Sequence, residues 1–193
     1  MLQRLYARTL DIAAGPHALI ALLAVSFVES SVFPIPPDIL LIPMILARPG
    51  QAWRLAALCT LASVIGGVLG YAIGYFLFDA IGRPILEYNH AMAGYEALKA
   101  GFTEWGVWII IVKGMTPIPY KLVTIASGVA HFPLLWFIGA SIVSRSLRFF
   151  LIATLLWWFG DAAREFIERR LMLVTSLFAI LLVGGIVAVA IYK

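Results

Sequence analysis

The sequence predicts an all-α integral membrane protein with two inverted repeats, each a re-entrant helical hairpin followed by a transmembrane helix. Of its 193 residues, 63% are hydrophobic and only 12% are charged, which is too little polar surface for a soluble domain. Several apolar stretches reach the roughly 20 residues that a helix needs to cross a bilayer. Segments 34–38 (PIPPD) and 117–121 (PIPYK) also share a proline pattern at an offset of 83 positions.

The first part of the chain predicts a surface helix and the first hairpin. Residues 1–14 mix charged residues with leucines and lack a cleavage site, so we expect an interfacial amphipathic helix and no cleavable signal peptide. Stretches 17–31 and 38–47 are both too short to span a bilayer. Between them Pro34 and Pro36 interrupt the helix, because proline lacks a backbone donor and restricts the residue before it. These prolines mark the predicted hairpin tip.

The second half of the chain repeats this layout. Residues 80–104 are mixed polar and apolar, and we expect them to form a linker along the membrane surface. Stretches 105–116 and 121–131 flank Pro117 and Pro119, the predicted tip of the second hairpin. Irregular backbone inside a membrane must be buried in protein or line a wet cavity. The two tips are therefore expected to face each other or a cavity.

Three stretches are long enough to be transmembrane helices, namely residues 52–78, 134–160 and 171–192. A re-entrant hairpin enters and leaves on one side, so the single crossing after the first hairpin places the second on the opposite side. The repeats, 17–79 and 105–160, are therefore inverted, an architecture found in many secondary transporters. We predict a single membrane domain covering residues 1–193.

Basic residues outside the apolar stretches are distributed unevenly. Seven lie on the N-terminal side of this predicted topology: Arg4, Arg8, Arg48, Arg54, Arg164, Arg169 and Arg170. The other side has three: Arg83, Lys99 and Lys193. The positive-inside rule then predicts a cytoplasmic N-terminus and an external C-terminus.

Six ionisable residues lie within the apolar stretches: Glu29, Asp38, Lys113, Lys121, Arg145 and Arg148. Charges are costly inside a bilayer, so these residues are candidates for a functional site. With all six charged the site would carry a net charge of +2, which favours an anion. Arg145 and Arg148 share one helix face, and paired arginines suit bidentate phosphate binding. Opposed tips would bring the acids of the first repeat towards the bases of the second.

Structural roles stay open for several residues. Asp38 can cap helix 38–47, and Glu29 can form a buried ion pair with Lys113 or an arginine. His131, at a hairpin exit, is a further candidate because histidine titrates in the physiological range. A face on which another backbone packs closely is predicted by three glycines at four-residue spacing, Gly66, Gly70 and Gly74.

Several of these features resemble the DedA family, also called the SNARE-associated or VTT-domain superfamily. The resemblance rests on the acids Glu29 and Asp38 with prolines between them, on the glycine helix, and on KGMTPIPYKLVTIASGV at 113–129. The motif at 113–129, together with Ser144, Arg145 and Arg148, is most similar to the YqaA-like branch of the family. The resemblance covers roughly residues 26–159.

This resemblance implies opposed re-entrant hairpins and the transport or scrambling of lipids, including undecaprenyl phosphate and phosphatidylethanolamine, in a bacterial cytoplasmic (inner) membrane. For some members it also implies dependence on the proton-motive force. The chain departs from the family pattern at Gly67 and Tyr75, where an aspartate and an arginine are usual, and at Lys113 and Lys121, where arginines are favoured.

We therefore predict a transporter of a phospholipid or polyprenyl phosphate, with the phosphate bound by Lys113, Lys121, Arg145 and Arg148. Glu29 and Asp38 would compete for these bases, and protonation of Glu29 would release them, which couples transport to protons. The alternative is a proton- or cation-coupled antiporter of a small solute. A lipid phosphatase or transferase is disfavoured, because the sequence has three histidines and no serine with an evident base.

Other partners are limited by the composition. The single cysteine, Cys59, precludes an internal disulfide, and no metal-ligand spacing occurs, so we expect no metal and no cofactor. The net charge of +4 is explained without a nucleic-acid partner, because part of it lies within apolar stretches. A homo-oligomer is compatible with the sequence. A passive scaffold would leave the buried charges without a purpose.

Overall fold

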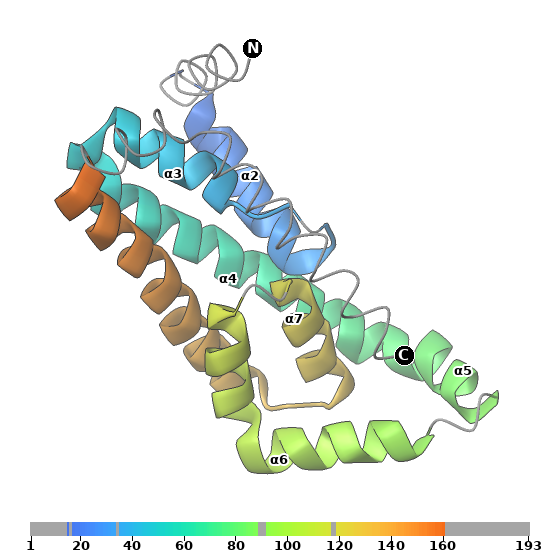
Figure 1. The fold of residues 1–193 in the computed structure, drawn as a ribbon. Helices are drawn as coiled ribbons and strands as arrows, with labels where there is room; N and C mark the ends of the chain where they lie inside the picture. The colour runs from blue at the N-terminus through green and yellow to red at the C-terminus, as the bar shows by residue number, and fades with distance from the viewer. Residues whose placement is uncertain (1–14, 16, 34, 89–91, 117–118, 161–193) are drawn as a thin grey trace, which may run out of the picture.

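The computed structural model describes residues 15, 17–33, 35–88, 92–116 and 119–160 (Figure 1). These residues form helices joined by short turns and contain no β-strand, which confirms the all-α prediction for this part of the chain. The predicted surface helix 1–14 and the predicted transmembrane helix 171–192 lie outside the described residues.

Two short helices flank the first proline run. Helix α2 (Ala18–Ser31) ends in a turn in which the amides of Val32 and Phe33 both donate to the carbonyl of Val28, at 2.8 and 2.9 Å. Helix α3 (Asp38–Ala47) follows Pro37, whose φ of −66° suits a helix start. The prolines thus separate the two helices where the sequence predicted a break.

A long central helix follows. After a 3₁₀ turn, η1 (Pro49–Gln51), α4 runs over Ala52–Leu77, and this confirms the predicted helix 52–78 to within one residue. The chain continues through a π-helical turn, η2 (Phe78–Gly82), into the short helix α5 (Arg83–Tyr88). The predicted linker is therefore helical where it leaves α4.

The second pair of short helices departs from the prediction in one respect. Helix α6 (Met92–Met115) is continuous, whereas a surface linker ending at 104 and a separate hairpin arm starting at 105 were expected. No proline lies within α6 to interrupt it, and the change of direction is a bend in the helix (Figure 1). Helix α7 (Tyr120–Val129) begins directly after Pro119.

The end of α7 has a tight, hydrogen-bonded turn. The amide of His131 donates to the carbonyl of Gly128, and the amide of Phe132 donates to the carbonyl of Ser127, at 2.9 and 3.0 Å. This pairing is the Schellman motif, which requires a left-handed residue after the helix. His131 supplies it with φ 54°, a conformation that glycine usually provides. The last described helix then spans Leu134–Gly160.

Two helices of the described residues are long and apolar enough to cross a membrane. They are Pro49–Leu77, which includes α4, and Leu134–Gly160. Figure 1 shows α2 and α3 beside the N-terminal half of α4 and α7 beside its C-terminal half, and the end of α6 packs on α7. The inverted repeat and the re-entrant character of the two hairpins stay predictions, because both depend on the position of the bilayer.

The glycines of α4 bring two other backbones against it. A β-carbon at Gly66 would collide with the backbone of Phe27 on α2, and one at Gly74 would collide with the backbone of Ile125 on α7. A β-carbon at Gly70 would meet both the carbonyl of Ser30 and the side chain of Thr124. The predicted small-residue face is confirmed, and it packs α2 and α7 side by side on α4.

Two apolar clusters leave a polar layer between them. The first includes Leu22, Leu41 and Phe149, and the second includes Tyr71, Ile110 and Phe137. Along α4 and the last helix, the buried polar residues fall in sequence between the residues of these clusters: Thr60, Ser63, Ser141, Ser144 and Arg145. The tips of both helix pairs meet in this layer.

Candidate functional site

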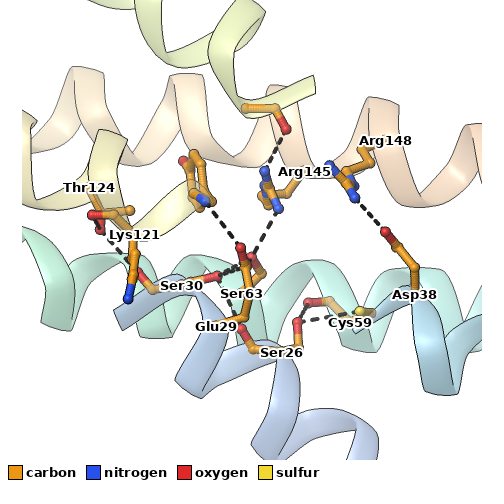
Figure 2. A network of polar contacts seen from close by, with 12 residues as sticks. Ser26, Glu29, Ser30, Asp38, Cys59, Ser63, Lys121, Thr124, Arg145 and Arg148 are labelled. Atoms are coloured by element: carbon orange, nitrogen blue, oxygen red, sulfur yellow. Dashed lines mark hydrogen bonds and ion pairs between the residues drawn. The ribbon is translucent and has the colours of Figure 1, made fainter. Parts of the chain in front are cut away.

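Two acid–arginine pairs join the first helix pair to the last helix. Glu29 of α2 faces Arg145, with 3.8 Å between Oε2 and Nη1. Asp38 of α3 forms an ion pair with Arg148, in which Nη2 donates to Oδ2 (Figure 2). Only 2% of the Arg145 side chain is exposed, against 22% for Arg148. The two arginines therefore differ in access although they lie one helical turn apart.

Both carboxylate groups lie at the N-terminus of a short helix, Glu29 reaching from α2 to the start of α7. Oε1 of Glu29 accepts a hydrogen bond from the backbone amide of Tyr120, the first residue of α7, at 3.1 Å. Asp38 is the first residue of α3. A helix N-terminus carries unpaired amides and a partial positive charge, which carboxylates stabilise.

The charged groups of the basic side chains reach helix C-termini, where unpaired carbonyls carry partial negative charge. Arg145 donates to the carbonyl of Gly114, and Arg148 donates to the carbonyl of Thr116 at 3.2 Å, both at the end of α6. Lys121 Nζ donates to the carbonyl of Val32, just beyond α2, at 2.9 Å. The charged side chains thus satisfy the ends of the interrupted helices.

Tyr120 is part of the site, and the sequence interpretation missed it. Its ring centroid lies 3.9 Å from the guanidinium carbon of Arg145, which is a cation–π contact. Its hydroxyl lies 2.6 Å from Oγ of Ser141. The side chain of Tyr120 is fully buried. Its position directly after Pro119, within the repeated proline motif, is the sequence feature that could have indicated its role in the site.

A row of buried hydroxyl groups borders Glu29. Ser30 Oγ lies 3.2 Å from Oε2 of Glu29 and 2.6 Å from Oγ of Ser63 on α4. Thr124 of α7 donates to the carbonyl of Ser30 at 3.0 Å (Figure 2). Ser26 donates to the carbonyl of Cys59 at 2.8 Å. This row links α2, α4 and α7 across the polar layer.

The predicted site residues are only partly brought together. Glu29, Asp38, Arg145 and Arg148 form the paired network, and Lys121 lies at its edge. Lys113 is exposed on α6 and takes no part in it. Of the predicted tip residues, Pro36 and Pro119 flank the network at the starts of α3 and α7, whereas Pro34 and Pro117 lie outside the described residues.

The capping role considered for Asp38 is wrong. The N-cap of α3 is Pro37, and the start of this helix has no side-chain capping hydrogen bond. Asp38 lies inside the first turn, and its Oδ1 is buried without a hydrogen-bond partner among the described residues. The ion-pair alternative for Glu29 is realised with Arg145 instead of Lys113.

Two open depressions reach the surface, and one of them borders the charged network. One, of about 280 Å³, is lined by Arg148 together with the apolar side chains of Met115, Leu151 and Ile152. The other, of about 470 Å³, lies around His131 and Trp136, away from the charged pairs. The first depression therefore places one guanidinium at an apolar, accessible surface. No group of three or more metal-ligating side chains occurs among the described residues.

The comparison with family models identifies a family for this chain. The model of the VTT domain matches residues 35–158. An uncharacterized protein of Haemophilus influenzae is 38% identical over 157 residues, which is 81% of either chain. An uncharacterized protein of Histophilus somni is 40% identical over 156 residues, again 81% of either chain. No solved structure matches the chain. The chain belongs to the VTT-domain family, the DedA or SNARE-associated family of membrane proteins.

Proposed function

We propose that this protein is a flippase- or scramblase-like transporter that moves a phospholipid or a polyprenyl phosphate across the cytoplasmic membrane. VTT-domain proteins are generally membrane proteins for which transport has been proposed. The proposal concerns the lipid, which the family alone does not specify.

One observation carries this proposal: Arg148 lies at the edge of an open apolar depression. The guanidinium is held by Asp38 and the carbonyl of Thr116, while Leu151 and Met115 beside it are 52% and 44% exposed. A phosphate could bind the guanidinium while acyl or prenyl chains stay along the apolar walls. Among the described residues that line this depression, a small polar solute would find one charged side chain and apolar walls.

The resting network is charge-balanced, which sets the proposed mechanism. Glu29 neutralises Arg145 and Asp38 neutralises Arg148, so a phosphate must displace a carboxylate before it can bind an arginine. Protonation of Glu29 or Asp38 would weaken these ion pairs and favour exchange for phosphate. Lys121 would assist from the edge, and the binding role predicted for Lys113 requires α6 to move.

The proposed topology follows from the sequence. Both helix pairs would be re-entrant hairpins that open to opposite sides of the inner membrane, with the N-terminus cytoplasmic and the C-terminus external. The tips would then meet at mid-depth, where α4 and the last helix carry their polar residues. We also infer membership of the YqaA-like branch from the motif at 113–129, and we propose no catalytic role.

Arg148→Lys tests the proposed headgroup site. Lysine keeps the charge but loses the planar fork, so we expect the translocation rate of a phospholipid in reconstituted vesicles to fall about tenfold, with insertion and monodispersity unchanged. Arg83→Lys is the matched control, because Arg83 is exposed on α5 and pairs only locally with Glu87 at 3.1 Å. Equal rates in both variants would remove Arg148 from the phosphate site.

An antiporter of a small solute is the second candidate, and the hydroxyl row beside Glu29 favours it. A buried carboxylate that contacts Ser30, which in turn contacts Ser63, suits proton exchange. This function requires cation- or solute-driven proton flux in vesicles, lost in Glu29→Gln. Such flux without movement of any phosphate-bearing lipid would favour the antiporter.

A further inference from the structure

We propose that the Glu29 carboxylate occupies a built-in anion site at the N-terminus of α7, and that the phosphate of the transported lipid replaces it there during transport. This inference rests on the lipid transport proposed above. It adds a second, deeper phosphate position to the one at Arg148.

The N-terminus of α7 already holds an anion. The amide of Tyr120 donates to Oε1 of Glu29, and the helix that begins with Tyr120 is ten residues long. Helix N-termini bind phosphate readily, because their amides point outward and their dipole favours negative charge. Ser30, with Oγ 3.2 Å from Oε2 of Glu29, supplies a hydroxyl at the same place.

Arg145 is an independent indication of an anion site. Its residue exposure is 1%, yet its Nε has no hydrogen-bond partner among the described residues. The 3.8 Å separation between Nη1 and the Glu29 carboxylate is too long for a hydrogen bond. Buried guanidinium donors are normally satisfied. The Nη1 donor that faces Glu29 is therefore not hydrogen-bonded to the carboxylate, and a phosphate oxygen placed closer could accept from it.

Charge balance indicates which phosphate the site should prefer. A phosphodiester carries one negative charge, so its exchange for the Glu29 carboxylate leaves the charge of the buried network unchanged. A phosphomonoester carries about −1.5 to −2 at neutral pH, and burying the surplus charge is unfavourable. The inner site should therefore favour the diester of a phospholipid over the monoester of a polyprenyl phosphate.

Removal of the Glu29 side chain tests this site directly. Glu29→Ala deletes the carboxylate and keeps the Tyr120 amide, Arg145 and Ser30. The full-length variant in detergent is titrated with formate, dimethyl phosphate or methyl phosphate while its Tm is measured. We expect formate and dimethyl phosphate to raise the Tm saturably by about 2 to 4 °C, and methyl phosphate to raise it less. Wild type should not respond.

Ser63→Ala is the matched control, because it removes a buried hydroxyl beside Ser30 without removing an anion. Its Tm should not respond to the three anions. If Glu29→Ala does not fold, Glu29→Ser replaces it, since serine also removes the carboxylate and leaves room for a small anion beside Arg145. The same rise is expected there, and it should disappear when Arg145→Gln is added.

The outcomes separate this inference from the proposed function. A folded Glu29 variant whose Tm ignores all three anions overturns the inner site, even if wild-type vesicles move lipid. A saturable rise without lipid movement in wild type contradicts the transport function and leaves the anion site standing. A larger rise with methyl phosphate than with dimethyl phosphate overturns the preference for phospholipid.

Discussion

Arg145 and Arg148 are three residues apart, yet their surroundings give them different tasks. Arg145 is enclosed by the Tyr120 ring, the Gly114 carbonyl and Glu29, so its removal would leave a buried acid without a counter-charge. Arg148 is partly exposed beside an apolar depression. The outer arginine is therefore the one that a lipid headgroup can reach first.

Asp38→Asn and Asp38→Ala should have similar effects. Asp38 makes no capping hydrogen bond, so its contribution is the ion pair with Arg148, which both variants remove. We expect both to lower the Tm by about 2 to 4 °C, equivalent to about 1 kcal/mol for a chain of this size. Thermal unfolding in detergent measures this. An asparagine variant as stable as wild type, beside a destabilised alanine variant, would show that a neutral acceptor for Arg148 or a cap on α3 is sufficient and that the charge of Asp38 does not stabilise the protein.

At the scale of helices, the polar layer is explained by interrupted helix ends. Asp38 and Lys121 occupy the same position in the two proline motifs but carry opposite charges. Asp38 lies in the first turn of α3 and binds Arg148, whereas Lys121 lies in the first turn of α7 and binds the end of α2. The two repeats therefore share their prolines but differ in charge at this position. The contact of Lys121 with the end of α2 joins the second helix pair to the first.

Gly74→Ala should destabilise the protein, because the added methyl group would collide with the backbone of Ile125. Overpacking of this kind costs about 1 to 3 kcal/mol. Gly139→Ala is the matched control, since a β-carbon there meets no atom within 4 Å and alanine favours a helix. Thermal unfolding should show a lower Tm for Gly74→Ala only. An unchanged Tm in that variant would contradict the close approach of α7 to α4.

Some parts of this arrangement could be predicted from the sequence and others could not. The helix 52–78, the breaks at the prolines and the glycine face were predictable, because proline, glycine and hydropathy act locally. The continuous helix α6 was missed, since mixed polarity at 80–104 was interpreted as a linker, although no proline interrupts 92–115. The pairing of Glu29 with Arg145, and the part played by Tyr120, depend on contacts between distant segments that no local pattern specifies.

At the scale of the whole molecule, the fold places all its described buried charges in one layer between two apolar clusters. Burying charged groups inside a membrane protein costs free energy, so such a layer is a candidate for a functional site. The charged side chains of this layer also bind backbone carbonyls and amides at the ends of α2, α6 and α7, as the predicted hairpin tips would require inside a bilayer. Transport at the meeting point of two repeats is consistent with this design.

Topology can be measured with single cysteines in a Cys59→Ala background. Positions His17 and Gly50 flank the first helix pair, and Gly94 and Leu135 flank the second; all four are exposed. If the hairpins are re-entrant, a membrane-impermeant thiol reagent added outside intact cells should label Gly94→Cys and Leu135→Cys but neither His17→Cys nor Gly50→Cys. Labelling of only one residue of the first pair would mean that α2 and α3 together cross the membrane once, and this would end the inverted-repeat interpretation.

The most direct test of lipid transport is the movement of labelled lipids between the leaflets of vesicles that contain the wild-type protein. A panel of phospholipids and a polyprenyl phosphate is compared with a diacylglycerol of the same chains, which lacks phosphate. We predict protein-dependent movement of at least one phosphate-bearing lipid, accelerated well beyond that of the diacylglycerol control. No acceleration for any phosphate-bearing lipid, in vesicles where the protein is folded and inserted, would contradict the proposed function.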